Sequence, residues 1–164
     1  MFNIELICVG KLGEDYLKQA CGEYIKRLKS FCNIQVIEVS EGKIPSSPSA
    51  ANIQSAVERE GEAILKHIQA GRGGSRYVMG MCIEGKMRKS ESLAAKLQDI
   101  AADKSGRLTI IIGGSHGLSD GVKSACDELL SMSPMTFPHQ LFRVMALEQL
   151  YRAFSINSGS KYHK

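Results

Sequence analysis

Leu108-Thr109-Ile110-Ile111-Ile112 runs directly into Gly113-Gly114, and this run determines the fold class expected for the 164-residue chain. Its first five residues form an almost continuous apolar segment instead of alternating apolar and polar residues. Strands with this pattern are usually buried on both faces, as they are in a parallel sheet. The run therefore predicts a core strand of a parallel sheet that ends in a glycine loop.

The segments on either side alternate between strand and helix patterns. Apolar and β-branched runs predict strands at 2–9, 34–39, 77–83 and 108–112. Apolar residues at helical spacing predict helices at 14–30, 52–70 and 90–102, with Ser90 as the N-cap of the last. Strands that alternate with helices indicate an α/β domain with a mostly parallel sheet. No repeat or composition shift marks a boundary, so we expect a single domain over 1–164.

The composition is that of an ordinary globular protein, with 43% hydrophobic and 23% charged residues. Its apolar runs are far shorter than the roughly 18 residues needed to cross a bilayer, and the N-terminus does not resemble a signal peptide. The five cysteines include no C-x-x-C pair and no histidine at ligand spacing, which favours buried thiols over metal ligands. We therefore expect a cytoplasmic protein with no membrane span, no metal and no disulfide.

Cations gather in two parts of the sequence. From Lys66 to Lys89, six cations stand against one acid, a local charge of +5. From His139 to Lys164, four cations stand against one acid, a local charge of +3. Two basic clusters favour a polyanionic partner. Solvated basic loops are an equally good interpretation of the same pattern.

The glycine loop lies where α/β proteins commonly bind ligands. Gly113, Gly114 and Gly117 follow the carboxyl end of the predicted core strand, where backbone N–H and C=O groups converge. Their spacing does not match the dinucleotide fingerprint, the phosphate-binding P-loop or the G-x-S-x-G nucleophile turn. Any ligand would therefore be held mainly by backbone atoms, although a tight strand-to-helix turn would need the same glycines.

A second irregular stretch is Ser131-Met132-Ser133-Pro134-Met135-Thr136-Phe137-Pro138. Its two prolines disfavour a continuous helix and predict an extended loop with free backbone groups. By its own pattern, this loop is either a connector or a second ligand-binding segment.

The segment from His139 to Phe154 predicts a helix that is apolar on every face. Its apolar residues are Leu141, Phe142, Val144, Met145, Leu147, Leu150, Tyr151 and Phe154. A helix of this kind should be buried on all sides. One small domain usually covers a single side of a helix at its edge, so the pattern predicts a second subunit over the other side. Arg143, Glu148 and Arg152 would then lie in or beside the dimer seam.

Four motifs, in this order, resemble one protein family. They are Ile112-Gly113-Gly114-x-x-Gly117-Leu118, the stretch 133–140, the segment 143–152 and the closing Tyr162-His163-Lys164. With Val9-Gly10-Lys11 and Gly85-Lys86 included, essentially the whole chain is similar to the small, single-domain SPOUT RNA methyltransferases. The members that it resembles methylate N3 of pseudouridine 1915 in 23S ribosomal RNA of the large subunit.

The resemblance implies a SPOUT fold with a C-terminal trefoil knot, a homodimer, S-adenosylmethionine as methyl donor and large-subunit ribosomal RNA as substrate. Carried over by motif, the residues expected to line the cofactor pocket are Met81, Gly114, Ser133, Pro134, Met135, Thr136, Phe137 and Pro138. Arg143 and Arg152 would stabilise the developing anion or hold phosphate. His139, Tyr162 or His163 would accept or relay the proton.

Other interpretations of these residues stay open. Arg152 can form an ion pair with Glu148 one helical turn away, and His139 can cap the helix after Pro138. His67 and His116 are expected at the surface. Lys161 stands where the family often has proline, which leaves the tail free to be more mobile. A non-catalytic RNA-binding homodimer, or a small nucleotide-binding enzyme of another chemistry, fits the same basic and glycine-rich segments.

Overall fold

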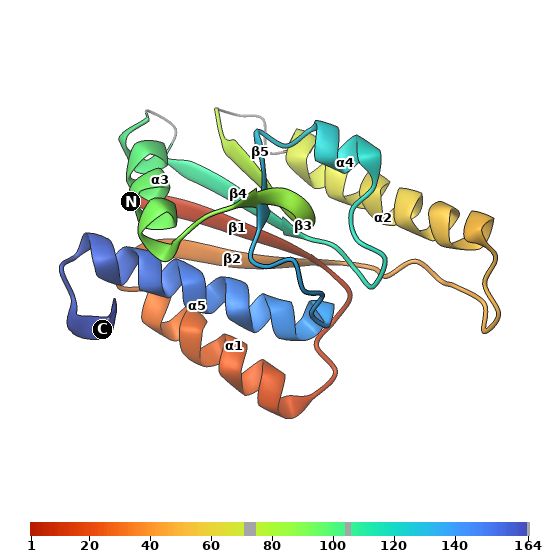
Figure 1. Cartoon of the computed structure of the whole chain (residues 1–164), viewed down its shortest axis with the longest axis horizontal. Coiled ribbons are helices and arrows are strands. Elements are labelled where there is room, and N and C mark those ends of the chain that lie inside the picture. Colours follow the sequence, from red (N-terminus) through yellow and green to blue (C-terminus); the bar gives the residue numbers. More distant parts are fainter. Residues whose placement is uncertain (71–74, 104–105, 164) are drawn as a thin grey trace.

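The protein folds into three layers, with a parallel sheet between two layers of helices (Figure 1). The computed structural model describes residues 1–70, 75–103 and 106–163, with His163 described by its backbone alone. The expected α/β class is confirmed.

Five parallel strands form the sheet, in the order β2-β1-β4-β3-β5. They are β1 (Phe2–Val9), β2 (Cys32–Val39), β3 (Tyr77–Met87), β4 (Arg107–Ile112) and β5 (Glu128–Ser131). β4 lies in the middle, between β1 and β3, and every residue from Leu108 to Ile112 is buried. The apolar run is therefore the core strand that its pattern predicts.

Helices cover both faces of this sheet. On one face lie α1 (Asp15–Leu28), α3 (Ser90–Ala102) and α5 (His139–Asn157), and on the other lie α2 (Ala50–Ala70) and the short α4 (Asp120–Ser124). Successive strand residues point to opposite faces, so Leu6 and Ile110 belong to the first core whereas Ile7 and Ile111 belong to the second. None of the described helices is both long and apolar enough to cross a membrane.

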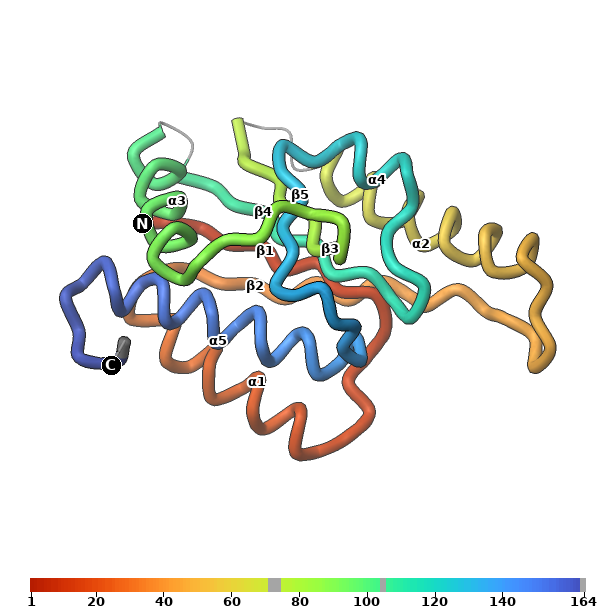
Figure 2. The backbone as a smooth tube through the Cα atoms, viewed as in Figure 1, coloured from red at the N-terminus to blue at the C-terminus, as the bar shows by residue number. Residues whose placement is uncertain are grey.

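The structure differs from the predicted elements mainly after residue 82. β3 continues to Met87 instead of ending at Ile83, and it pairs with β5 twice, at 79–81 and again at 86–87. Figure 2 shows this end of β3 passing over β5, a crossing compatible with the knotted topology that the resemblance implies. The extension was missed because Ile83 and Met87 are exposed, so it has no inward apolar pattern. α4 and β5 were missed because they are too short for a clear periodicity.

The start of α3 also differs from the prediction. Lys89 occupies the N-cap position and makes no side-chain capping bond, whereas Ser90 is the first helical residue. The Ser90 hydroxyl instead donates to the Gln149 side-chain carbonyl on α5, at 2.9 Å. A tertiary contact therefore takes the hydroxyl that was predicted to cap the helix.

α5 does not lie at the edge of its layer, which corrects the expectation that only one side of this helix is covered by its own domain. It lies on the sheet between α1 and α3, and the terminal 3-10 helix η1 (Lys161–His163) folds back against its C-terminal end (Figure 1). Leu147, Leu150 and Ala153 are buried within one chain, and Leu141 is 40% exposed. Of the eight apolar residues predicted on this helix, intrachain packing buries Leu147 and Leu150 and leaves the other six partly or fully exposed. The second subunit therefore stays a prediction.

Candidate cofactor site and the two ends of helix α5

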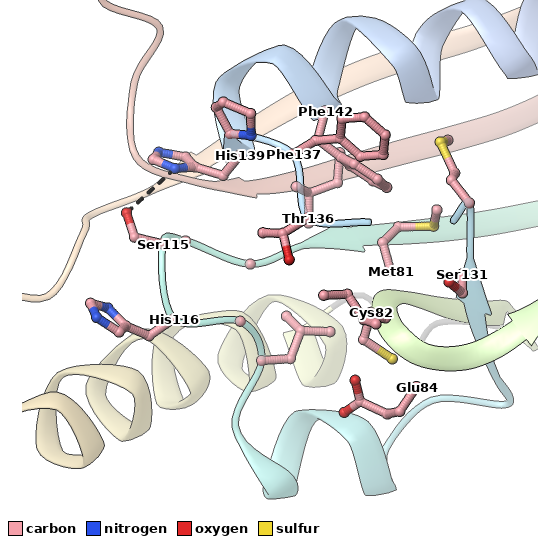
Figure 3. Close-up of a pocket in the computed structure, with 18 of the residues that line it drawn as sticks. Met81, Cys82, Glu84, Ser115, His116, Ser131, Thr136, Phe137, His139 and Phe142 are labelled. Atoms are coloured by element: carbon pink, nitrogen blue, oxygen red, sulfur yellow. Dashed lines mark hydrogen bonds between the residues drawn. The ribbon is translucent and has the colours of Figure 1, made fainter. Parts of the chain in front are cut away.

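A cavity of about 780 Å³ opens near the carboxyl ends of β3 and β4. Its walls come from the end of β3, the glycine loop after β4 and the connector between β5 and α5 (Figure 3). These segments are distant in sequence, but parallel neighbouring strands end at the same edge of a sheet and bring them together. The volume lies within the range of small-molecule sites.

Most residues predicted to bind the cofactor line this cavity: Met81, Gly114, Ser133, Met135, Thr136, Phe137 and Pro138. Pro134 is exposed and does not line it. The connector is held in a turn, because the Ser131 hydroxyl donates to the Ser133 carbonyl and the Met135 amide donates to the Ser133 hydroxyl, each at 3.0 Å. Such side-chain bonds replace regular secondary structure and fix the irregular backbone at the cavity wall.

The glycine loop doubles back on itself, which requires glycine at position 113. A Cβ atom on Gly113 would lie 2.7 Å from the backbone carbon and oxygen of Gly117. Gly117 itself has a φ of 79°, and its amide donates to the Gly114 carbonyl at 3.1 Å. This part of the wall is therefore built mainly from backbone atoms, as the sequence pattern predicts.

Glu60 of α2 lies beneath the glycine loop and was not predicted. It is 7% exposed, and its Oε1 accepts a hydrogen bond from the Gly42 amide at 2.8 Å. Its two carboxylate oxygens would lie 3.4 and 3.5 Å from a Cβ atom on Gly114, and burial raises the pKa of this carboxyl. The available signal was an acid at an inward-facing helical position. Buried glutamates are rare, so the pattern alone gives little reason to single this residue out.

Sequence reasoning also missed several polar side chains at the cavity. Glu84 on the β3 extension forms an ion pair with Lys123 of α4, and both residues line the cavity together with Cys82. Lys123 holds the pKa of the Glu84 carboxyl below its usual value. His116 is exposed, as expected, but it also lines the cavity. Glu84 and Lys123 had no place in the predicted site because their elements were not predicted.

Of the predicted catalytic residues whose side chains are described, only His139 lines the cavity. Its Nδ1 lies 3.5 Å from the Ser115 hydroxyl, as the dashed line in Figure 3 marks. Pro138 occupies the N-cap position of α5, and no side chain caps the helix there. The interpretation of His139 as a helix cap is therefore wrong, and its ring lies at the cavity edge.

Arg143 does not line the cavity, because the fold uses its guanidinium internally. The side chain is 3% exposed; Nη1 pairs with Glu38 at 2.6 Å and Nη2 donates to the Gly10 carbonyl at 2.9 Å. Gly10 has a φ of 80° in the turn after β1, and His139 Nε2 would lie 3.7 Å from a Cβ atom there. Arg143 thus fixes the turn beside His139, which corrects its expected place in a dimer seam or against substrate.

Arg152 and Tyr162 form a separate cluster at the other end of α5. Arg152 Nη2 pairs with Glu148 Oε1 at 2.6 Å, so the predicted alternative of an i,i+4 ion pair is confirmed. The Tyr162 ring packs edge-on against Tyr151, with 4.8 Å between centroids, and the Arg152 guanidinium carbon lies 4.9 Å from the Tyr162 ring centroid. The tail is thus packed on α5. The side chain of His163 lies outside the described part of the chain.

The pKa of Tyr162 narrows the chemistry open to this residue. Burial raises that pKa to about 12, and the nearby Tyr24 and Glu148 act in the same direction. Its hydroxyl therefore stays protonated near neutral pH. In that form it can donate a hydrogen bond.

The first basic segment carries less free charge than its sequence suggests. Arg76 pairs with Glu5 and Arg88 pairs with Glu128, and these arginine side chains are only 8% and 16% exposed. Arg72 lies outside the described residues. Lys66, Lys86 and Lys89 are exposed. Counting cations along the sequence overestimated this patch because long-range ion pairs do not show in a local count.

The described residues hold no group of three or more histidine, cysteine or acidic side chains that could bind a metal ion. All five cysteines are free; Cys8, Cys21 and Cys32 are buried, and Cys82 and Cys126 are partly buried. Buried thiols are therefore confirmed at three positions. That the protein needs no metal stays a prediction.

The fold and the cavity together define an α/β domain with a cavity at its sheet edge, walled in part by the backbone of the glycine loop. A family model described as a predicted SPOUT methyltransferase matches residues 2–163. The chain therefore belongs to the SPOUT methyltransferase family, as its motifs suggest.

Two curated relatives match the chain over nearly its full length. Ribosomal RNA large subunit methyltransferase H of Latilactobacillus sakei subsp. sakei (strain 23K) is 46% identical over 162 residues, which cover 99% of each chain. The protein of the same name from Clostridium acetobutylicum (strain ATCC 824) is also 46% identical over 162 residues, with the same coverage.

Two solved structures resemble the fold. A probable methylase family protein from Haemophilus influenzae Rd KW20 has a TM-score of 0.52 at 15% identity, covering 97% of this chain and 67% of the other. A probable methyltransferase from Bordetella pertussis Tohama I has a TM-score of 0.53 at 12% identity, covering 92% and 93%. At these identities the likeness supports the fold alone.

Proposed function

We propose that this protein transfers a methyl group from S-adenosylmethionine to N3 of a pseudouridine in large-subunit ribosomal RNA. Family membership and the full-length similarity to ribosomal RNA large subunit methyltransferases support the reaction class and the RNA substrate. The observation that carries the proposal is the cavity between the glycine loop and the connector. The choice of pseudouridine N3 rests on the resemblance of the motifs.

The cavity fits S-adenosylmethionine in size and in the chemistry of its walls. Met81, Ile112, Phe137 and Phe142 offer apolar surface for a purine, and the glycine loop and connector offer backbone groups for its polar atoms. When bound, this cofactor supplies an electrophilic methyl group on a sulfonium. The chain's own residues must then orient the target base and accept its proton.

Gly113→Ala is expected to weaken S-adenosylmethionine binding at least about tenfold, because the new methyl group would collide with the Gly117 backbone and displace the loop. Isothermal titration calorimetry measures this change. Gly22→Ala in α1 is the matched control, since a Cβ atom there meets no atom within 4 Å, and it should bind normally and be slightly more stable. Normal binding by Gly113→Ala would remove the glycine loop from the cofactor site.

The proposed chemistry requires an imide anion. A protonated imide nitrogen is a poor nucleophile, so the site must remove its proton and stabilise the resulting charge. His139, at the cavity edge, is the candidate proton acceptor. Arg152 is the candidate cation for the anion, and the protonated Tyr162 hydroxyl can donate to it.

His139 and Arg152 cannot meet at one base within a single chain. They lie about 13 residues apart on a continuous helix, which separates them by roughly 20 Å. A two-fold homodimer with crossed, antiparallel α5 helices would bring Arg152 and Tyr162 of one subunit to the cavity of the other. The exposed Leu141 and the partly buried Val144 and Met145 provide an apolar contact for this arrangement. The proposal therefore includes the homodimer.

A mixture of two impaired variants tests the shared site, at an S-adenosylmethionine concentration well below the dissociation constant of Gly113→Ala. In a mixed dimer of Gly113→Ala and Arg152→Ala, one cavity keeps an intact glycine loop and receives Arg152 from the other subunit. Unfolding and refolding the variants together should restore about one quarter of wild-type methylation, because half of the dimers carry one intact site of two. Each variant refolded alone is the control. A mixture that stays inactive, despite heterodimer formation shown by differential tags, would place the whole site in one subunit.

The reaction itself is tested on RNA. Purified protein, S-adenosylmethionine and large-subunit ribosomal RNA, presented free and in ribosomes, should yield a methylated pseudouridine detectable by nucleoside mass spectrometry. An RNA-binding dimer without catalysis would bind the RNA but neither bind S-adenosylmethionine nor produce the modified nucleoside. Affinity for RNA should fall steeply as salt rises if phosphate contacts dominate.

A further inference from the structure

One carboxylate oxygen halfway along α5 accepts hydrogen bonds from three donor atoms. Glu148 Oε1 accepts from Arg152 Nε at 3.0 Å, from Arg152 Nη2 at 2.6 Å and from the Tyr162 hydroxyl at 3.3 Å. The helix and the terminal tail therefore share one anionic partner.

The other oxygen of Glu148 is also held. Oε2 accepts from Gln149 Nε2 at 2.7 Å, and Gln149 Oε1 accepts from the Ser90 hydroxyl at 2.9 Å. The bonds form a continuous path from the start of α3, through α5, to the tail. Both carboxylate oxygens of Glu148 are therefore engaged. Oε2 is held from α3 through Gln149 and Ser90, and Oε1 binds Arg152 and Tyr162.

An ordinary helical ion pair on the same chain lacks these features. Glu23 and Arg27 on α1 form an i,i+4 pair at 2.8 Å, and their side chains are 51% and 42% exposed. The Glu148 and Arg152 side chains are 19% and 26% exposed, and the Glu148 oxygen also binds a residue of the tail. Charge-assisted bonds in a partly buried site are stronger and better defined than exposed ones.

We propose that Glu148 is a positioning residue that holds Arg152 and Tyr162 as one unit, so that cation and hydroxyl donor reach the target base together. The inference rests on the proposed function, in which these two side chains act on the RNA. Glu148 acts through them and needs no contact with substrate. Without the charge of Glu148, the Arg152 side chain regains rotamer freedom and the tail loses the hydrogen-bond partner of Tyr162.

Glu148→Gln tests this role with almost no change in shape. We expect kcat for RNA methylation to fall about ten- to hundredfold, the loss expected when catalytic groups are misplaced by about 1 Å. Affinity for S-adenosylmethionine should be unchanged. In an Arg152→Lys background the same substitution should cost much less, because the unit is already broken. Asp15→Asn, which neutralises the acid of an exposed i,i+3 pair with Lys18 at the start of α1, is the control and should keep wild-type kcat.

A second readout follows the tail independently of activity. The chain has five tyrosines and no tryptophan, so tyrosine ionisation can be followed by ultraviolet absorption. Burial is the main cause that raises the pKa of Tyr162, Tyr24 adds to it, and the Glu148 charge also disfavours the phenolate, so Glu148→Gln should lower this pKa. Tyr162→Phe identifies the signal, and Asp15→Asn on α1 should leave it in place.

The outcomes separate this inference from the proposed function. If wild-type protein methylates the RNA and Glu148→Gln matches it in kcat, Glu148 has no positioning role and the function stands. An unchanged Tyr162 titration in Glu148→Gln would likewise overturn the shared unit. If the wild type does not methylate ribosomal RNA, the proposed function fails, whereas the titration still decides whether Glu148 holds the tail.

Discussion

Arg152→Ala is expected to lower kcat for ribosomal RNA methylation at least about a hundredfold and to leave the dissociation constant for S-adenosylmethionine within about twofold. The loss is the usual cost of removing one preorganised group that stabilises developing charge. Cofactor binding should survive because Arg152 does not line the cavity of its own chain and, at the cavity of the other subunit, is proposed to act on the RNA base and not on the cofactor. Single-turnover methylation and calorimetry measure the two quantities separately.

Two further variants sharpen this result. Arg152→Lys keeps the charge but loses the planar fork that binds Glu148 through both Nε and Nη2, so it should recover only part of the activity. Arg59→Ala removes an arginine from α2, where it binds Ser55 and the Lys43 carbonyl, and should remain close to wild type. Turnover by Arg152→Ala at the wild-type rate would take Arg152 off the catalytic list.

Arg143→Ala should cause the largest loss of stability, about 3 kcal/mol or more in the free energy of unfolding. The substitution leaves the Glu38 carboxylate and the Gly10 carbonyl without their partner, and removing one partner of a buried ion pair costs about 3–5 kcal/mol. Because Glu38 is 35% exposed, water can reach it, which places the expected value at the lower end of that range. Urea unfolding monitored by circular dichroism, at one fixed protein concentration, gives the difference.

An exposed pair provides the comparison. Lys18→Ala breaks the ion pair with Asp15, whose members are 52% and 88% exposed, and should cost less than about 0.5 kcal/mol. Arg143→Lys keeps the charge but lacks the planar guanidinium that binds both Glu38 and Gly10. Its stability should therefore lie between those of Arg143→Ala and Lys18→Ala. If Arg143→Ala unfolds within about 1 kcal/mol of wild type, Arg143 does not anchor the turn after β1.

The regular elements were predictable because their signals are local. The apolar run 108–112 and the helical spacing along 14–30 and 52–70 repeat over enough residues to define an inward face. α4, β5 and the end of β3 are too short or too exposed to carry such a pattern. These elements surround the cavity, so the expected site had no place for Glu84 and Lys123.

The backbone part of the site was also readable from motifs. Glycines after a core strand and prolines in a connector restrict the chain wherever they occur, and both segments line the cavity. The polar side chains were harder to assign. Arg143 and Arg152 stand nine residues apart on one helix with the same chemistry, yet one is buried against Glu38 and the other shares Glu148 with the tail.

The sequence by itself therefore determined the α/β class, the core strand, the glycine loop and the irregular connector, because each depends on the conformational preferences of neighbouring residues. Only the tertiary structure decided which charged groups are used within the fold and which lie at the cavity. Arg143 meets Glu38 across 105 residues, and Tyr162 meets Glu148 where the chain turns back on α5. Which residues form such pairs depends on how elements distant in sequence pack together, and a local sequence pattern does not contain that information.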